Sequence, residues 1–235
     1  PLTAQTMARS TDGGIQHGGN VSPLSKYLRK LTLVSVAAAG VPQRVYMLDY
    51  LMFYPFVDMG TPDQQDMVNV QTLPRYATGA GVQMMAILVA PHGLVGDTFF
   101  VTYTNQDGTA GRVTPLHTMS TAIAVNGTIL TTQQTGAGRF GPFLALQAGD
   151  TGVRSIEAVQ CTAGTDVGLF TLVLVQPLAE MTVREITAPT EADFYLTSGG
   201  KLPAIVDDAY LNFISCPNGS LTGVPLFGDA TFIWN

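Results

Sequence analysis

The sequence predicts an all-β protein, built as an antiparallel β-sandwich of the jelly-roll kind with extended N- and C-terminal arms. Three observations lead to this fold class. Short stretches rich in β-branched and aromatic residues recur along the chain, Gly, Pro and Asp turn sequences separate them, and amphipathic helical periods are almost absent. No segment repeats itself, which disfavours propellers and solenoids.

Strands are expected at residues 31–37, 45–57, 82–90, 98–105 and 167–175, with two further short strands between 141 and 166. Residues 98–105, TFFVTYTN, alternate apolar and polar side chains as a half-buried strand does. The dipeptides Asp107-Gly108 and Asn126-Gly127 predict hairpin turns. Pro55 has no N–H to donate, so the strand at 45–57 should end, bulge or lie at a sheet edge there.

Three parts are expected along the chain: an N-terminal arm (1–25), a jelly-roll-like sandwich domain (26–186) and a C-terminal extension (187–235). The arm is polar and rich in Gly, so it should be disordered alone or ordered on a neighbour. A short helical turn is predicted at 25–29, with Ser25 as its cap. The extension should pack on the sandwich or on a neighbouring subunit, because its Trp234 would otherwise lie on a fraying end.

The low charge of the chain points to burial by partner subunits. Charged residues make up 12% of the sequence, against about 25% in ordinary globular proteins. Hydrophobic residues make up 46% and the mean hydropathy is +0.24. Because charged residues are scarce in interfaces, we expect a homo-oligomer. A surface rich in Thr, Ser, Gln and Asn is the alternative explanation, and the chain has those residues too.

The strand predicted at 167–175 is apolar on both faces. One face should pack in the sandwich, and the other should meet another copy of the chain. The predicted subunit interface therefore comprises Val167, Leu169, Val173, Leu174 and Trp234.

Charge and hydropathy argue against nucleic acid and membrane as direct partners. The net charge is −6 and the pI about 4.8, and the densest basic group is only Lys26, Arg29 and Lys30. Phosphate binding needs a basic stripe, which is missing. The longest apolar run, 31–41, is far shorter than the roughly 18 residues of a membrane-spanning helix.

The cysteines and the N-terminal residues predict a reducing compartment. Cys161 and Cys216 fit no zinc-binding spacing, and we expect two free thiols, with a disulfide as the alternative. No charged and then apolar leader follows Pro1, so no secretory signal is expected.

A search for chemistry finds no catalytic residue, cofactor site or metal site, so we expect a protein that is not an enzyme. Phosphate-binding, dinucleotide-binding, nucleophile-elbow and zinc-protease motifs are absent. The histidines are too far apart in sequence for a metal pair, and are expected in loops or at the surface: His17, His92 and His117.

Two groups of acidic residues could form sites, but structural roles are favoured for both. The acidic residues Asp58, Asp63 and Asp66 could bind Ca²⁺, but their spacing fits a solvated loop better. Asp207 and Asp208 could form a carboxylate pair, but neighbouring residues of a strand point to opposite faces, so helix-capping or turn roles are favoured.

An aromatic run leaves sugar binding open as a less favoured alternative to core packing. Exposed aromatic side chains form the sugar platforms of β-scaffold lectins and glycosidases, whereas buried ones dominate cores. The run comprises Tyr46, Tyr50, Phe53, Tyr54 and Phe56.

Three blocks of the sequence resemble a family of proteins encoded among the virion structural genes of tailed bacteriophages and prophages. They are LDYLMFYPFVDMGTPDQQDMVNVQTLPRYATGAGVQ (48–83), FFVTYTNQDGTAGRVTP (99–115) and GPFLALQAGDTGVRSIEAVQ (141–160), with LVLVQPLA after them. The resemblance does not extend to residues 1–25 or 187–235. It implies a virion component, assembled in the host cytoplasm, and no enzymatic mechanism.

The resemblance and the β pattern together favour a capsid decoration (cement) protein, with a homotrimer as the favoured oligomer. Its partners would be further copies of itself and the major capsid protein. A tail, collar or baseplate subunit is the first alternative, and a carbohydrate- or receptor-binding module of the virion is the second.

Overall fold

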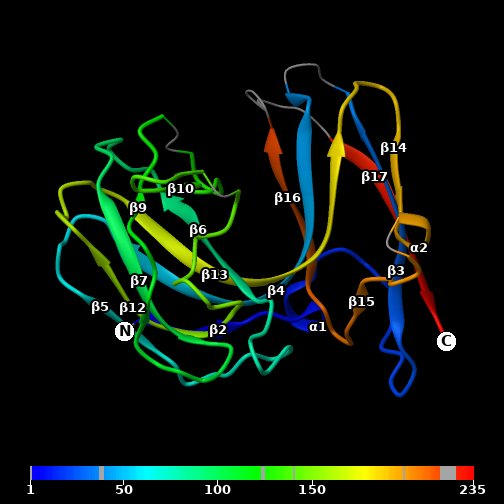
Figure 1. Ribbon diagram of the computed structural model, residues 1–235, viewed down its shortest axis with the longest axis horizontal. Helices are drawn as coiled ribbons and strands as arrows, with labels where there is room; N and C mark the ends of the chain where they lie inside the picture. The colour runs from blue at the N-terminus through cyan, green and yellow to red at the C-terminus, as the bar shows by residue number, and fades with distance from the viewer. Residues whose placement is uncertain (1, 37–39, 123–124, 140, 198, 218–225) are drawn as a thin grey trace. The chain divides into compact units, whose positions relative to one another are not determined.

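The computed structural model describes residues 2–36, 40–122, 125–139, 141–197, 199–217 and 226–235. It confirms an all-β protein with several antiparallel sheets (Figure 1). The helices among these residues are α1 (Arg9–Asp12) and α2 (Phe194–Thr197), each of four residues. No helix of the described residues is long and apolar enough to cross a membrane.

The chain divides into two compact units. Unit 1 comprises residues 1–7 and 50–176, and unit 2 comprises residues 8–49 and 177–235. Each unit has its own hydrophobic core. Two long strands, β4 (Gln43–Asp58) and β13 (Leu169–Val183), contribute residues to both units, so the division falls inside strands and not in linkers.

Unit 1 contains the larger sheet of the chain. Its strands lie in the spatial order β1 (Leu2–Thr3), β5 (Gln65–Val68), β12 (Val153–Cys161), β7 (Thr98–Asn105), β9 (His117–Thr118), β10 (Gln133–Gln134) and β11 (Gly138–Arg139), and β8 (Arg112–Val113) also pairs with β7. The pairings are antiparallel except that between β1 and β5. In β7 the apolar side chains Phe99, Val101 and Tyr103 are fully buried, as the alternation of the sequence predicts.

The second sheet of unit 1 contains β2 (Gln5–Thr6), the later part of β4, the first part of β13, and β6 (Gln83–Ala90). The free side of β6 is covered by loops. The N–H groups of Leu130 and Leu144 donate to the carbonyls of Ala86 and Met84, and Leu88 N–H donates to Thr128 O. The core of the unit includes Leu51, Tyr54, Phe99, Phe170 and Leu174.

Unit 2 is organised around β3 (Lys26–Ser35). On one side β3 pairs with β14 (Thr190–Asp193) and β15 (Ala204–Ile205), and on the other side it pairs with β17 (Leu226–Trp234) along its whole length. The first half of β4 pairs with β16 (Leu211–Pro217). Both sets of strands contribute to one core, which includes Leu28, Leu31, Val45, Met47, Phe194 and Leu211.

The structure corrects several local expectations. Residues 26–29 begin strand β3 and do not form a helical turn, because Leu28 and Leu31 are needed in the core of unit 2. Residues 142–149 form no strand; they run along β6 as a loop. Strand β4 continues past Pro55 to Asp58, with a local irregularity at Phe56, whose φ is 60°. Gly127 does adopt a turn conformation, with φ of 79°, but residues 123–124 lie outside the described part.

Both ends of the chain take part in the folded units, so the structure differs from the expected division at residues 25 and 186. Strands β1 and β2 pair with β5 and β4, and Ala4 between them is fully buried in the core of unit 1. Residues 8–36 belong to unit 2 together with the C-terminal strands β16 and β17. Composition made residues 1–25 look like an arm, because short pairings to distant strands leave no periodic pattern.

Candidate functional site

Three aspartates with buried carboxylates hold the loops of unit 1. The exposed fractions of Asp97 and Asp166 are 7% and 2%, and that of the Asp150 side chain is 3%. A buried charge costs free energy unless it is paired and hydrogen-bonded, so the partners of each carboxylate show what it does.

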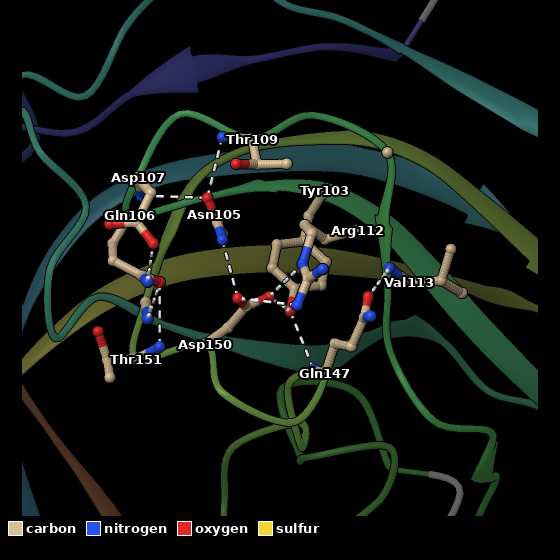
Figure 2. A network of polar contacts seen from close by, with 12 residues as sticks. Tyr103, Asn105, Gln106, Asp107, Thr109, Arg112, Val113, Gln147, Asp150 and Thr151 are labelled. Carbon is tan, nitrogen blue, oxygen red and sulfur yellow. Dashed lines mark hydrogen bonds and ion pairs between the residues drawn. The ribbon is translucent and has the colours of Figure 1, made fainter.

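Asp150 receives four hydrogen bonds from three side chains (Figure 2). Tyr103 OH donates to its Oδ2 at 2.6 Å, and Asn105 Nδ2 donates to its Oδ1 at 2.8 Å. Arg112 binds both oxygens, with Nε–Oδ2 at 2.9 Å and Nη2–Oδ1 at 3.2 Å. Tyr103 OH in turn accepts the N–H of Gln147 at 2.9 Å. The carboxylate therefore joins β7, β8 and the turn before β12.

The turn after β7 is locked to the turn before β12 by two amides. Asn105 Oδ1 accepts the N–H groups of Asp107 and Thr109, at 3.0 and 2.9 Å, which closes the Asp-Gly turn that the sequence predicts. Gln106 Oε1 accepts the N–H of Thr151 at 3.0 Å. Figure 2 shows both amides beside Asp150. These contacts fix loop conformation and leave no side chain poised for proton transfer.

The electrostatics of this cluster favour a fixed charge state. The Arg112 guanidinium, aided by hydrogen bonds from Tyr103 and Asn105, lowers the pKa of Asp150 from 3.8 to about 2. Burial, and then the hydrogen bond to Asp150, raise the pKa of Tyr103 well above its usual value of 10.0. General acids and bases work best with a pKa near the working pH. Both groups move away from neutrality, so the cluster is built for structure.

A hollow of about 360 Å³ lies beside this cluster, lined by Gln83 and residues 143–150. Two of the polar side chains on its wall are already engaged. Asp150 is saturated as described, and Gln147 Oε1 accepts the N–H of Val113 at 3.1 Å. Among the described residues, the wall of the hollow therefore offers no charged group that is free to orient a substrate.

Asp97 and Asp166 hold a second group of loops. Asp97 accepts the N–H of Thr98 at 2.7 Å, the N–H of Gly164 at 2.8 Å and the hydroxyl of Thr162 at 3.0 Å. The segment after β12 is thereby tied to the start of β7. Its role parallels that of Asp150.

Asp166 joins the 92–95 loop to the loop before β13. Its Oδ1 accepts the N–H groups of Gly93 and Val167, at 2.5 and 2.8 Å. Its Oδ2 lies 3.1 Å from His92 Nδ1, and neither side chain of this pair is exposed. Burial alone would raise the pKa of Asp166, but the N–H groups of Val167 and Gly93 and the His92 ring outweigh it and hold the pKa below its usual value.

Above this pair the two loops present three exposed aliphatic side chains, which we call the apolar tip: Leu94, Val95 and Val167. Their exposed fractions are 39%, 57% and 62%. A Cβ placed on Gly93 would lie 3.5 Å from Val167 Cγ2 and 3.8 Å from Val95 Cγ2, which shows how closely the loops approach. Leu94 has a φ of 61°, a left-handed conformation that residues with a side chain rarely adopt.

The predicted interface residues fall into two groups. Val167 and Trp234 are exposed, at 62% and 59%. Val173 and Leu174 are buried within the chain itself, at 6% and 0%, and Leu169 is half-buried. Strand β13 lies between β4 and β6, and the burial of both its faces in one chain accounts for its apolar sequence without a second subunit. The pattern of the sequence could not distinguish these two ways of covering the second face.

The histidines were expected in loops or at the surface, and all three are buried. The exposed fractions of His17, His92 and His117 are 2%, 5% and 1%. In unit 2, His17 Nε2 donates to Ala209 O at 2.9 Å, and Lys26 Nζ donates to His17 Nδ1 at 3.2 Å. Burial lowers the pKa of both His17 and Lys26. Each histidine satisfies a buried backbone or side-chain group.

The carboxylates of Asp207 and Asp208 accept backbone N–H groups. Asp207 accepts the N–H groups of Val21 and Ser22, at 2.9 and 3.1 Å, and Asp208 accepts the N–H of Ser10 at 2.8 Å. Both residues lie in a turn, as expected, but their carboxylates bind distant segments, and Asp208 binds the first turn of α1 as a helix cap does. Within the described residues there is no cluster of three or more His, Cys, Asp or Glu side chains that could hold a metal.

The two cysteines and the aromatic run lie mainly in buried or half-buried positions. Cys161 in unit 1 is buried, Cys216 in unit 2 is half-buried, and both are free thiols. In the aromatic run, Tyr46 and Tyr54 are buried and Phe56 is 56% exposed. Tyr50 and Phe53 are half-buried, so one ring of the five is exposed and the run presents no group of exposed rings that could form a platform for a sugar.

Comparison of the chain with protein-family models, with curated proteins and with solved structures gave no match. Of the apolar tip and the exposed residues of β17, the sequence predicted Val167 and Trp234 but missed Leu94, Val95, Phe227 and Ile233. A signal for the tip was present in the two hydrophobic residues of the sequence His92-Gly-Leu-Val-Gly96, which stand in a Gly-rich turn where no core is expected.

Proposed function

We propose that the chain is a structural protein of a tailed-bacteriophage virion, and specifically a capsid decoration protein that binds and stabilises the major capsid lattice. On this proposal its sheets form a jelly-roll-like sandwich and it has no enzymatic activity. The observation that carries the proposal is the apolar tip, an exposed aliphatic surface whose two loops are joined from beneath by the buried carboxylate of Asp166. The resemblance of residues 48–83, 99–115 and 141–160 supplies the virion setting.

The construction of the tip suits attachment to a partner. Exposed apolar groups are costly in a free protein unless they meet a partner surface. Fixing them in advance lowers the entropy lost on binding, because the loops need no ordering when contact is made. Asp166 provides that fixation through the N–H groups of Gly93 and Val167. The left-handed conformation of Leu94 is a local strain of the kind found at binding loops.

Each tip need bind only weakly. A decoration protein occupies many equivalent positions on a shell, and several modest contacts made at once give a large combined affinity. The low fraction of charged residues, 12%, agrees with a surface that partner subunits cover in the assembled particle. Loop-holding carboxylates such as Asp150 add rigidity, which a cement function requires.

The location of the chain in intact particles tests this proposal. Cryo-EM of particles carrying a labelled chain should show density over the capsid faces. Density confined to the tail, collar or baseplate would replace the head assignment by the tail alternative. Binding to a glycan array, or hydrolysis of host polysaccharide, would favour the carbohydrate-binding alternative instead.

A pair of variants tests the role of the tip. Val167→Asp should weaken binding of the purified chain to particles that lack it by at least about tenfold, because each 1.4 kcal/mol of lost contact is a factor of ten. The matched control is Val70→Asp, since Val70 is 67% exposed in unit 1 and lies outside the tip. Equal binding by the two variants would refute the assignment of the tip.

A further inference from the structure

Strand β17 ends unit 2 with an edge that nothing in the described residues covers. It is nine residues long and pairs with β3 on one side only. No backbone hydrogen bond within the described ranges reaches its other side; the nearest contact is Asn235 N–H to Ser25 O, beyond its end. Figure 1 shows β17 beside β3, leading to the C-terminus. Such an edge is a template for pairing with another strand.

Other edges among the described residues are shorter, covered or end in a proline. Strand β16, also at the edge of its sheet, has seven residues, of which the first accepts the N–H of Ile15 and the last is Pro217. The free side of β6 is covered by loop residues, among them Leu130 and Leu144. The strands on the far side of β3 have four and two residues. Proteins usually blunt a long edge with Lys, Pro or a bulge. Strand β17, LFGDATFIW, has no Lys and no Pro, and its only charge is Asp229.

The irregularity in this pair of strands belongs to β3 and leaves β17 regular. Between Thr231↔Lys30 and Phe232↔Leu28 the register shifts by one residue on the β3 side. In β17 the even-numbered residues Leu226, Ala230 and Phe232 pack against the core of unit 2. The odd-numbered ones point outward, and Phe227 and Ile233 among them are 57% and 40% exposed. A regular pleat with outward apolar groups is what strand addition requires.

We propose that β17 pairs antiparallel with β17 of a second copy, across a two-fold axis at Ala230. In this register all nine residues of each strand take part. Phe227 faces the partner's Ile233, and Leu226 faces the partner's Trp234. Asp229 faces the partner's Thr231, so the one charge meets a hydroxyl and not its own copy. Facing apolar pairs stabilise a sheet and facing like charges destabilise it, so the strand is complementary to itself.

Shifting the pairing by two residues would weaken this match. If the axis lay at Asp229, the two carboxylates would face each other and Trp234 would hang beyond the partner strand. The self-pairing of one surface patch is the mark of a two-fold interface. The proposal therefore specifies a dimer contact, whereas a trimer needs two different patches. It does not depend on the virion assignment, because it concerns the isolated chain.

The mass of the purified full chain tests the contact. Sedimentation analysis at tens of micromolar, a concentration at which a standard interface is populated, should give twice 24.9 kDa. Ile233→Lys should return the mass to that of one chain, because a Lys in the outward row opposes edge pairing. Val70→Lys, at an exposed apolar position of unit 1 that lies outside the apolar tip, should leave the dimer intact. Unchanged circular dichroism would show that both variants fold.

A disulfide cross-link tests the register. Facing residues of antiparallel strands have Cα atoms about 4.5–5.5 Å apart, within the range that a disulfide spans. In a Cys216→Ser background, chains with Asp229→Cys mixed with chains with Thr231→Cys should cross-link on mild oxidation. Either variant alone should cross-link at least several-fold less, because its own cysteines are then offset along the strands.

Three results would overturn the proposal. One is a monomeric mass for the unmutated chain, which would mean that the edge of β17 pairs with a strand of another protein or stays unpaired. Another is a trimer, or a dimer that survives Ile233→Lys. The third is loss of the dimer in both lysine variants, which would place the contact elsewhere. None of these results bears on where the chain lies in a virion, so the two proposals can fail separately.

Discussion

His117 gives the sharpest test of how buried polar groups stabilise unit 1. The residue is 1% exposed, and its Nε2 accepts the N–H of Ala145 at 2.9 Å. An imidazole that accepts at Nε2 is neutral, with its proton on Nδ1. Burial lowers the pKa of His117 from 6.5 to about 4. Protonation of the folded protein would place a charge in the core and break the bond to Ala145.

The sign and size of the effect follow from linkage. Because the folded pKa is depressed, the contribution to stability is complete above pH 6.5 and is lost as the pH falls through about 4. Over the whole interval the loss is roughly 3 kcal/mol, since each pKa unit corresponds to about 1.4 kcal/mol. Near pH 5, where the unfolded histidine is charged and the folded one is not, the loss is already about 2 kcal/mol.

The variant His117→Gln separates this histidine from every other titrating group. Gln can still accept a hydrogen bond but does not ionise. In urea unfolding at about pH 7 and about pH 5, the stability advantage of the unmutated chain over the variant should shrink by about 2 kcal/mol. A constant difference across that interval would refute the argument, since His117 would then have the same pKa in both states.

Three further changes test other parts of the structure. Leu174→Asp should cost several kcal/mol, enough to prevent folding of unit 1, because it buries an unpaired charge at a position with no exposure; soluble expression checks it. Arg112→Ala should raise the pKa of Asp150 from about 2 toward 3.8, as read by NMR titration, and should lower stability by about 1–3 kcal/mol. Deleting residues 1–7 should lower the melting temperature, because β1, β2 and Ala4 pack in unit 1; an unchanged melting temperature would restore the expected arm.

The sequence predicted strands where the pattern is local. Residues 98–105 form a strand with the predicted alternation, and β4, β6 and β13 fall on the predicted apolar runs. Pairing partners could not be read, because they are chosen by distant residues. Strand β1 pairs with Met67 and Val68, and β17 pairs with β3 some two hundred residues earlier. The division into two units could not be predicted for a related reason: β4 passes from one unit to the other without any turn sequence.

The carboxylate clusters were beyond sequence reasoning for the same physical reason. Asp166 and the Gly93 N–H that it accepts are separated by 73 residues, and Asp150 and Tyr103 by 47. Neither spacing corresponds to a motif, because the geometry is supplied by the sheet between them. The sequence shows that charged residues are few. It does not show that several of them are buried as acceptors of loop N–H groups.

The scarcity of charge and the open edge of β17 are connected. Of the few acidic side chains in the chain, Asp97, Asp150 and Asp166 are buried as ligands of backbone and side-chain donors. Lys26 is likewise buried, with its Nζ on Gly19 O at 2.6 Å. The surface therefore carries fewer charges than even the 12% of the sequence suggests. Charged side chains on an edge strand oppose pairing with another strand. Because several of the few charged residues are buried and do not lie on β17, the edge of β17 remains able to pair.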